Sequence, residues 1–134
     1  MKYWLIKSEP DCYSIDDLKK DKKTAWTGVR NYQARNFIRE MKQGDLIIYY
    51  HSSANPPSAV GIAKVVKNPY PEIDPLWSAV DVGFVEKFKT PLPLPVIKMN
   101  PKLEGMLVTQ QGSRLSIQPV SKEHFNVIQK LGNK

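Results

Sequence analysis

The segment Leu46-Ile47-Ile48-Tyr49-Tyr50-His51 (residues 46–51) is a continuous apolar and aromatic run, which is the pattern of a buried strand. Gly44-Asp45 ends the unit before it, and Asn-Pro-Pro-Ser at 55–58 forms a loop after it. Residues 59–66 predict a second strand, in which Gly61 permits a bulge or a close approach of another backbone. This part of the chain therefore predicts two strands joined by a proline-containing loop.

Further strands and helices are predicted on both sides of these two strands. Strands are expected at residues 3–7, 77–88 and 115–120, with a loop or short extended piece at 24–28. Helices are expected at 14–20, 31–41 and 121–132, the first and last capped by serine. Pro91, Pro93 and Pro95 exclude a helix in their region and favour an extended edge or connector. This pattern predicts an α+β domain with a curled, mostly antiparallel sheet or small β-barrel and short flanking helices.

The composition indicates one domain, spanning residues 1–134, because no repeat, low-complexity run or linker divides the chain. One cysteine excludes an internal disulfide, and one cysteine with two histidines cannot fill a four-ligand zinc site. The longest apolar stretches run five or six residues, whereas a transmembrane helix needs about twenty. We therefore expect an intracellular protein, cytoplasmic or, in a eukaryote, nuclear, with no membrane partner, metal or cofactor.

Motifs of several enzyme classes are absent. The chain has no dinucleotide fingerprint, no phosphate-binding loop, no nucleophile elbow and none of the cysteines of a zinc deaminase. Cys12 and His51 are a conceivable nucleophile and base, but one such pair occurs by chance in most domains. A nuclease or base-modifying activity that uses Glu9, Asp81 or His51 with a borrowed metal is the enzymatic alternative. We expect a non-catalytic protein.

Positive charge is concentrated between residues 19 and 39. That segment holds seven Lys and Arg residues and one Asp, a local charge of +6 in a chain of formal net charge +7. Such a cluster is either a solvated face or a surface that attracts a polyanion such as nucleic acid. Composition alone leaves both readings open.

Hydrogen-bonding and aromatic side chains are dense in four segments: 7–10, 26–36, 49–52 and 113–120. Each lies where a predicted strand ends or a helix begins, so their side chains can converge on one pocket. A tryptophan with serine, asparagine and histidine suits a flat, hydrogen-bonding ring such as a nucleobase. Taken singly, Trp26 and Tyr49 are also ordinary packing residues, and His51 is as easily a structural histidine.

At these segments the chain resembles the EVE domain family, over nearly its whole length. The resemblance rests on Lys7-Ser8-Glu9-Pro10, on residues 28–36 (GVRNYQARN) and on Ser113-Arg114-Leu115-Ser116. It implies a PUA-like fold, a small barrel with flanking helices, related in shape to the YTH domains that bind methylated adenine in RNA. It also implies a nucleic-acid-binding module that holds a modified base in an aromatic pocket, with modified cytosine in DNA, such as 5-methylcytosine, as the expected ligand. A module that binds a modified RNA base is the alternative.

The resemblance assigns two sets of residues, with Trp26 as the stacking wall and Tyr70 as the second aromatic wall. Two positions depart from the family pattern: Ser53 stands where an asparagine is common, and Thr27 where many members carry aspartate. The base pocket is expected to contain Lys7, Ser8, Trp26, Arg30, Asn31, His51, Ser52 and Tyr70. Phosphate contacts are expected from Lys20, Lys22, Lys23, Arg35, Arg39 and Arg114. The identity of the modification, the strand context and the oligomeric state stay open.

Overall fold

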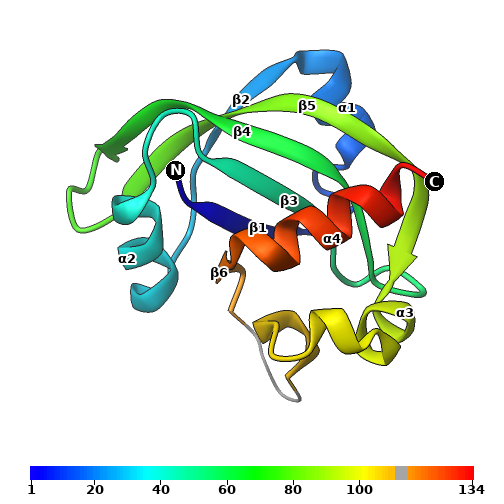
Figure 1. Ribbon diagram of the computed structural model, residues 1–134. Helices are drawn as coiled ribbons and strands as arrows, with labels where there is room; N and C mark the ends of the chain where they lie inside the picture. The colour runs from blue at the N-terminus through cyan, green and yellow to red at the C-terminus, as the bar shows by residue number, and fades with distance from the viewer. Residues whose placement is uncertain (111–114) are drawn as a thin grey trace.

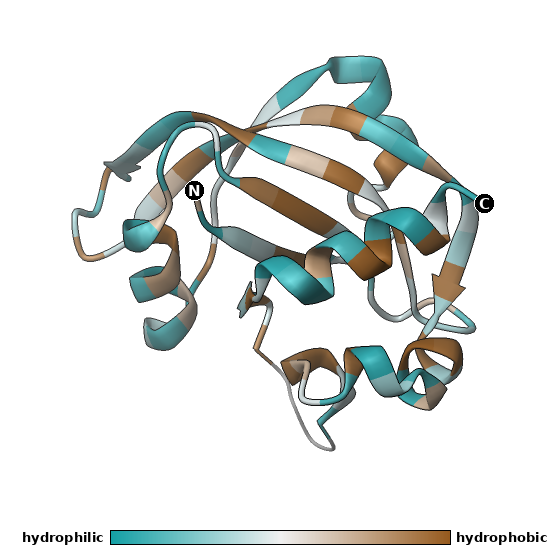
Figure 2. Ribbon diagram, viewed as in Figure 1, coloured by the Kyte–Doolittle hydropathy of each residue, from teal (hydrophilic) through white to brown (hydrophobic). Residues whose placement is uncertain are grey.

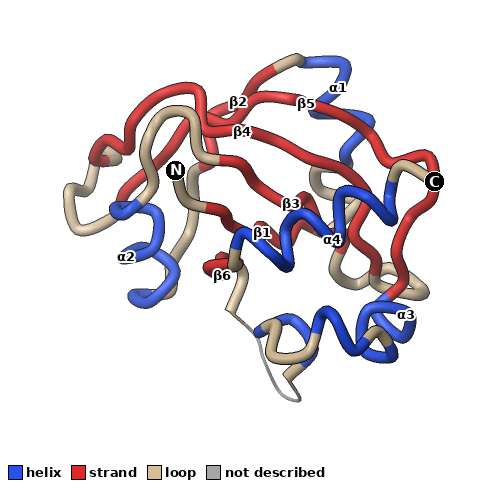
Figure 3. The backbone as a smooth tube through the Cα atoms, viewed as in Figure 1, coloured by secondary structure: helices blue, strands red, loops and turns tan. Residues whose placement is uncertain are grey.

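The structure is a computed structural model that describes residues 1–110 and 115–134 (Figure 1). Six strands form one mixed sheet, and four α-helices lie against it, as Figure 3 shows. The strands are β1 (Tyr3–Ser8), β2 (Lys23–Trp26), β3 (Leu46–His51), β4 (Ser58–Pro71), β5 (Ser78–Pro93) and β6 (Ile117–Val120). The helices are α1 (Ile15–Asp21), α2 (Tyr32–Glu40), α3 (Leu94–Met99) and α4 (Lys122–Gly132), with 3₁₀ turns at Pro101–Leu103 and Leu107–Thr109.

The strand order of the sheet is β2-β5-β4-β3-β1-β6. β1 and β3 run parallel, Tyr3 opposite Leu46 and Ser8 opposite His51, and the other neighbouring strands run antiparallel. The predicted strand at residues 46–51 is thus confirmed, and it lies inside the sheet. Gly61 is confirmed as a site of close approach, because a Cβ there would lie 2.5 Å from the Glu86 carbonyl oxygen.

The α+β class is confirmed, but the sheet does not close into the expected barrel. In the described residues β2 pairs only with β5, and β6 only with β1, so these two strands are the edges. Helix α2 contacts the edge strand β6 and also β5, the neighbour of the other edge strand. The sheet is nonetheless strongly curled, as the arching course of the long strands β4 and β5 in Figure 1 shows.

Two local predictions are corrected by the structure. The prediction that proline excludes a helix around residues 91–95 is wrong at its end, because α3 begins at Leu94 with Pro95 in its first turn. A first-turn residue needs no intrahelical N–H bond, so proline is tolerated there. The closing strand begins at Ile117 rather than at Leu115. Residues 23–26 form strand β2, where the sequence predicted either a loop or a short extended piece at 24–28.

Side-chain alternation along β1 and β3 builds a core on each face of the sheet. Ile6, Ile47 and Tyr49 belong to one cluster, which α1 and α2 cover, while Leu5 and Ile48 belong to the other, which α3 and α4 cover. Figure 2 shows this hydrophobic concentration along β3. None of the helices in residues 1–110 and 115–134 is both long and apolar enough to span a membrane.

Candidate nucleic-acid interface

A pocket of about 270 Å³ lies where the end of β1, the turn before α1 and strand β2 come together. Its lining residues are Ser8, Cys12, Tyr13, Thr24, Ala25, Trp26 and Thr27. Two predicted base-pocket residues, Ser8 and Trp26, are therefore brought together although 18 positions separate them in the sequence. We call this the Trp26 pocket.

Trp26 is half-buried at the last position of β2, opposite Val80 of β5. Its ring meets Tyr13 at 6.3 Å and an interplanar angle of 76°, and Tyr49 at 5.8 Å and 89°. Among the described residues no ring is stacked parallel to it. The side chain is thus fixed by edge contacts with its neighbours and not by a stacked partner.

The polar part of the Trp26 pocket is organised around the carbonyl oxygen of Tyr13. That oxygen accepts a hydrogen bond from Ser8 Oγ at 2.7 Å and another from the Tyr49 hydroxyl at 2.7 Å. The Tyr13 hydroxyl donates to Asp21 at 2.8 Å, and burial with this bond raises the pKa of Tyr13 to about 12. Because Ser8 donates its only proton inward, its oxygen is left as an acceptor.

His51 lies at the end of β3 and is not among the residues that line the Trp26 pocket. Its Nε2 accepts the backbone N–H of Ile15 at 3.0 Å, which satisfies a donor in the first turn of α1. Burial lowers the pKa of His51, which favours the neutral ring that this bond requires. The structure therefore places His51 at a helix start, and its contact with a base stays a prediction.

Two further predicted pocket residues flank Ser8. Lys7 is half-buried and burial lowers its pKa, but side chains alternate along β1, so Lys7 points to the face opposite Ser8 and Ile6. Ser52 donates its backbone N–H to the Ser8 carbonyl at 3.0 Å and so lies beside the Trp26 pocket without lining it.

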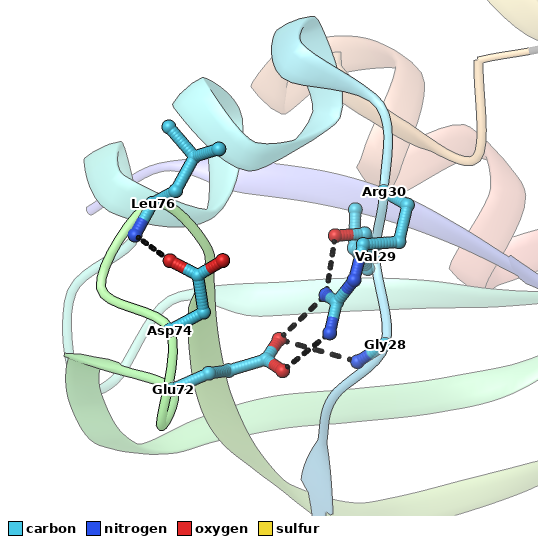
Figure 4. Close-up of polar contacts among 6 residues, drawn as sticks. All are labelled: Gly28, Val29, Arg30, Glu72, Asp74 and Leu76. Atoms are coloured by element: carbon cyan, nitrogen blue, oxygen red, sulfur yellow. Dashed lines mark hydrogen bonds and ion pairs between the residues drawn. The ribbon is translucent and has the colours of Figure 1, made fainter.

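Arg30 and Asn31, which were expected at the pocket rim, are engaged within the protein. Asn31 caps α2, its Oδ1 accepting the Ala34 N–H at 2.9 Å. Arg30 makes a forked ion pair with Glu72, at 2.9 and 3.1 Å, and Glu72 also accepts the Gly28 N–H at 3.2 Å (Figure 4). The hydrogen bond from Arg30 lowers the pKa of Glu72, and the same bond raises the pKa of Arg30.

The other two arginines of this region are bonded to the turn between β4 and β5, residues 72–77. Arg39 donates from Nε to Ser78 Oγ at 2.9 Å and to the Leu76 carbonyl at 3.1 Å, and Arg35 donates to the same carbonyl at 3.1 Å. Arg35 and Arg39, which were expected to hold phosphates, both bond to this turn in the structure. We call residues 72–77 the clamped turn.

Tyr70 is not a second wall of the Trp26 pocket. It lines a different pocket, with Arg39 and Ser78, and its hydroxyl donates to Asp81 at 2.5 Å, a bond that raises the pKa of Tyr70 to about 12. Asp81 follows Val80 on β5, and consecutive side chains point to opposite faces. The hydroxyl of Tyr70 is therefore engaged away from the Val80 side chain, and Tyr70 lies outside the Trp26 pocket.

The lysine cluster lies at the opposite end of β2 from Trp26. Lys20 is in the last turn of α1, Lys22 follows the helix with φ of 70°, and Lys23 begins β2, all three exposed. Trp26 lies three positions along the strand from Lys23, which is about 10 Å. This distance leaves the lysines beside the Trp26 pocket and not inside it. Arg114 lies outside the described residues.

Sequence reasoning missed Tyr13 and the clamped turn. Tyr13 is a single aromatic residue in a turn, where no periodicity marks it, although the nearby capping serine fixes where α1 begins. The clamped turn interacts through backbone carbonyls and a carboxylate that lies 42 positions from Arg30, so its partners leave no local pattern. Within the described residues, no group of three His, Cys, Asp or Glu side chains is placed to hold a metal ion.

Comparison with known proteins identifies relatives along the whole chain. The family model described as EVE domain matches residues 2–131. Mouse thymocyte nuclear protein 1 is 41% identical, over 94% of this chain and 71% of the mouse protein. A solved structure from Pseudomonas syringae has a TM-score of 0.91 at 46% identity, covering 97% of this chain and 99% of that one.

The comparison that bears most on a ligand is a crystal structure of human THYN1 protein in complex with 5-methylcytosine-containing DNA. It is 36% identical with a TM-score of 0.90, and it covers 100% of this chain and 99% of the human chain.

The YTH domain of Zygosaccharomyces rouxii MRB1 protein shares the fold, with a TM-score of 0.61 at 15% identity over 99% of this chain and 87% of that one. The expected kinship in shape with YTH domains is thus confirmed. Because the family model matches residues 2–131 and a relative is 41% identical over 94% of the chain, the chain belongs to the EVE domain family.

Proposed function

We propose that this protein is a non-catalytic, intracellular DNA-binding module that takes a modified cytosine into the Trp26 pocket. The observation that carries the proposal is the half-buried Trp26 ring, held by edge contacts and left without a parallel partner among the described residues. A base entering the pocket supplies that partner. The human relative solved with 5-methylcytosine-containing DNA supports the choice of ligand.

The energetics of such binding set a requirement for the polar part of the pocket. Taking a base out of the stack costs a few kcal/mol, and stacking on an aromatic side chain returns about 1 to 3 kcal/mol per base. A methyl group adds only about 0.8 kcal/mol of apolar burial, which is about fourfold in affinity. Burial of the methyl group therefore gives only a weak preference for 5-methylcytosine over cytosine. Because stacking tolerates any base, selection of cytosine over other bases must come from hydrogen bonds.

Ser8 supplies the first of these hydrogen bonds. Its hydroxyl proton is committed to the Tyr13 carbonyl, so its oxygen is oriented as an acceptor. The N4 amino group of cytosine is a donor, whereas thymine presents a carbonyl oxygen at the equivalent place. The pocket therefore prefers cytosine to thymine, and modification at carbon 5 contributes through contact with the aromatic side chains.

Replacement of Trp26 tests the proposal. Binding of fluorescent single-stranded and duplex oligonucleotides with one 5-methylcytosine or one cytosine is measured by anisotropy for the protein, Trp26→Ala and Trp26→Phe. We expect Trp26→Ala to lose about tenfold or more in affinity and to lose its selectivity, and Trp26→Phe to keep most of both. Circular dichroism establishes that the variants fold. Selectivity that persists in a folded Trp26→Ala variant rejects the pocket.

The same titration separates the alternatives. An RNA oligonucleotide with the same modified base is preferred only if the protein contacts a 2′-OH group, and equal or weaker RNA binding supports the DNA proposal. Incubation of the DNA with protein and Mg²⁺ or Mn²⁺, followed by product analysis, tests the absence of catalysis. We expect intact DNA, and turnover that is lost in His51→Ala would replace the proposal with the enzymatic alternative.

A further inference from the structure

The clamped turn exposes aliphatic side chains at its tip. Ile73 has an exposed fraction of 106%, and Leu76 of 45%. Both project from a turn closed by hydrogen bonds from Glu72 N to the Trp77 carbonyl at 2.9 Å and from Trp77 N to the Asp74 carbonyl at 3.0 Å. The Asp74 carboxylate accepts the Leu76 N–H at 3.0 Å (Figure 4). The turn is thus ordered although its tip is in water.

The rest of the protein holds this turn in place from two sides. On one side Glu72 is bonded to Arg30 and to the Gly28 N–H. On the other side Trp77 stacks on Tyr32 at 5.2 Å and 21°, with the Arg30 guanidinium 5.1 Å from the Trp77 ring. The tip is therefore a rigid projection, and an exposed isoleucine on a rigid projection is poised to contact a partner without further loss of conformational freedom.

The position of the tip relative to the Trp26 pocket indicates what the partner is. Thr27 lines the pocket, and the next residue, Gly28, is the one bonded to Glu72, immediately before Ile73. The pocket and the tip are therefore neighbours on one edge of the molecule. Arg30 pairs with Glu72, and Arg35 and Arg39 beside the turn outnumber the one remaining carboxylate, Asp74. The surroundings therefore carry a small positive surplus, which suits a phosphate backbone.

We propose that Ile73 is a wedge that enters the base stack of duplex DNA next to the base that the Trp26 pocket takes up. The inference rests on the proposed function and extends it from the base to the duplex. Removing one base from a duplex leaves a gap, and apolar side chains inserted between base steps hold such openings. The wedge is needed only where a stack exists, so a single strand has no use for it.

The test compares Ile73→Ser with Met99→Ser on duplex and single-stranded DNA. Met99 is the matched control, because it is 83% exposed and lies on α3, away from the clamped turn. Each DNA carries one 5-methylcytosine with 2-aminopurine as its neighbour, so that anisotropy of a separate label reports binding and 2-aminopurine fluorescence reports unstacking. We expect Ile73→Ser to lose about tenfold more affinity on the duplex than on the single strand, with a weaker fluorescence rise. Met99→Ser is expected to match the unaltered protein.

Each other result has a defined meaning. Equal effects of Ile73→Ser on duplex and single strand, or no effect on either, overturn the wedge. If Trp26→Ala still abolishes selectivity in those experiments, the proposed function stands without the wedge. If the unaltered protein binds neither DNA, the proposed function fails and the wedge fails with it.

Discussion

The Trp26 pocket and the clamped turn are adjacent, yet they are held by different forces. In the pocket an aromatic ring packs inward against the core cluster that contains Tyr49 and Val80. In the clamped turn the aliphatic tip points outward, and guanidinium groups at the surface hold the backbone behind it. Salt screens exposed charge pairs and weakens them, whereas it does not weaken apolar burial in this way. The two regions should therefore respond differently to mutation, to pH and to ionic strength.

The largest difference between the two regions is expected in how much a substitution in each lowers the free energy of unfolding. Trp26→Ala removes a half-buried ring from a packed cluster, and we expect the free energy of unfolding to fall by about 2 to 3 kcal/mol. Ile73→Ser, at a fully exposed position, is expected to change it by less than about 0.5 kcal/mol. Urea titration followed by far-UV circular dichroism measures both values. A domain with ordinary stability stays folded after either change.

The comparison is sharpened by Trp26→Phe, which keeps an aromatic ring in the same place. We expect this variant to recover more than half of the loss seen in Trp26→Ala. Equal stability of Trp26→Ala and Ile73→Ser would show that the pocket wall is no part of the core, which would contradict the packing described above.

Acid is expected to weaken the pocket side through His51. Its folded pKa is lowered from 6.5, so the folded state binds fewer protons than the unfolded state as the pH falls below about 6.5. The stabilisation from the neutral ring is therefore present above that pH and is lost as the pH falls through the folded value. We expect a loss of at most about 1 kcal/mol, because one hydrogen bond to the Ile15 N–H is broken at a half-exposed site.

His51→Gln is the control for this pH dependence, since an amide can accept the same N–H bond but does not titrate. Urea titrations at pH 7.5 and 5.5 should show a smaller difference for this variant than for the unaltered protein. An identical pH dependence in both would assign the acid response to other groups.

The sequence predicted elements well where the pattern was local and continuous. The run at 46–51 predicted strand β3, and the serine-capped helix expected at 14–20 is α1, in which Ser14 accepts the Asp17 N–H. The helix expected at 31–41 is α2, which buries Ala34 and Ile38. The expected closure of the sheet into a barrel was wrong, because no local pattern tells whether edge strands meet each other or stay apart.

The site was predicted in part for the same reason. Ser8 and Trp26 meet as expected, since both follow from strand ends. The contacts of the arginines within the protein were not predicted, because a positive side chain in a sequence has no visible partner, and the carbonyl oxygens that Arg35 and Arg39 bind belong to a distant turn. Their contact with phosphate stays a prediction. The bond between His51 and the Ile15 N–H was not predicted, because nearly every residue has a backbone N–H and a sequence does not show which one a side chain will bind.

The smallest effect is expected at the ion pair of the clamped turn. Glu72→Gln keeps the shape of the side chain but removes the charge that pairs with Arg30, and because the Arg30 side chain is half exposed, we expect only a small change in stability. The bond from Arg30 lowers the pKa of Glu72, so this bond orders the turn at pH values above the usual carboxylate pKa of about 4.3. The ordering is lost as the pH falls through the lower pKa of the folded state.

Trp77 contacts Arg30, so its side-chain indole NMR signal should shift on acidification in the unaltered protein and shift less in Glu72→Gln. High salt should mimic part of that shift at neutral pH, and it should leave the indole signal of Trp26 in place. If salt shifts the indole signal of Trp26 as far as that of Trp77, charge also holds the pocket. The contrast between the two regions would then have to be abandoned.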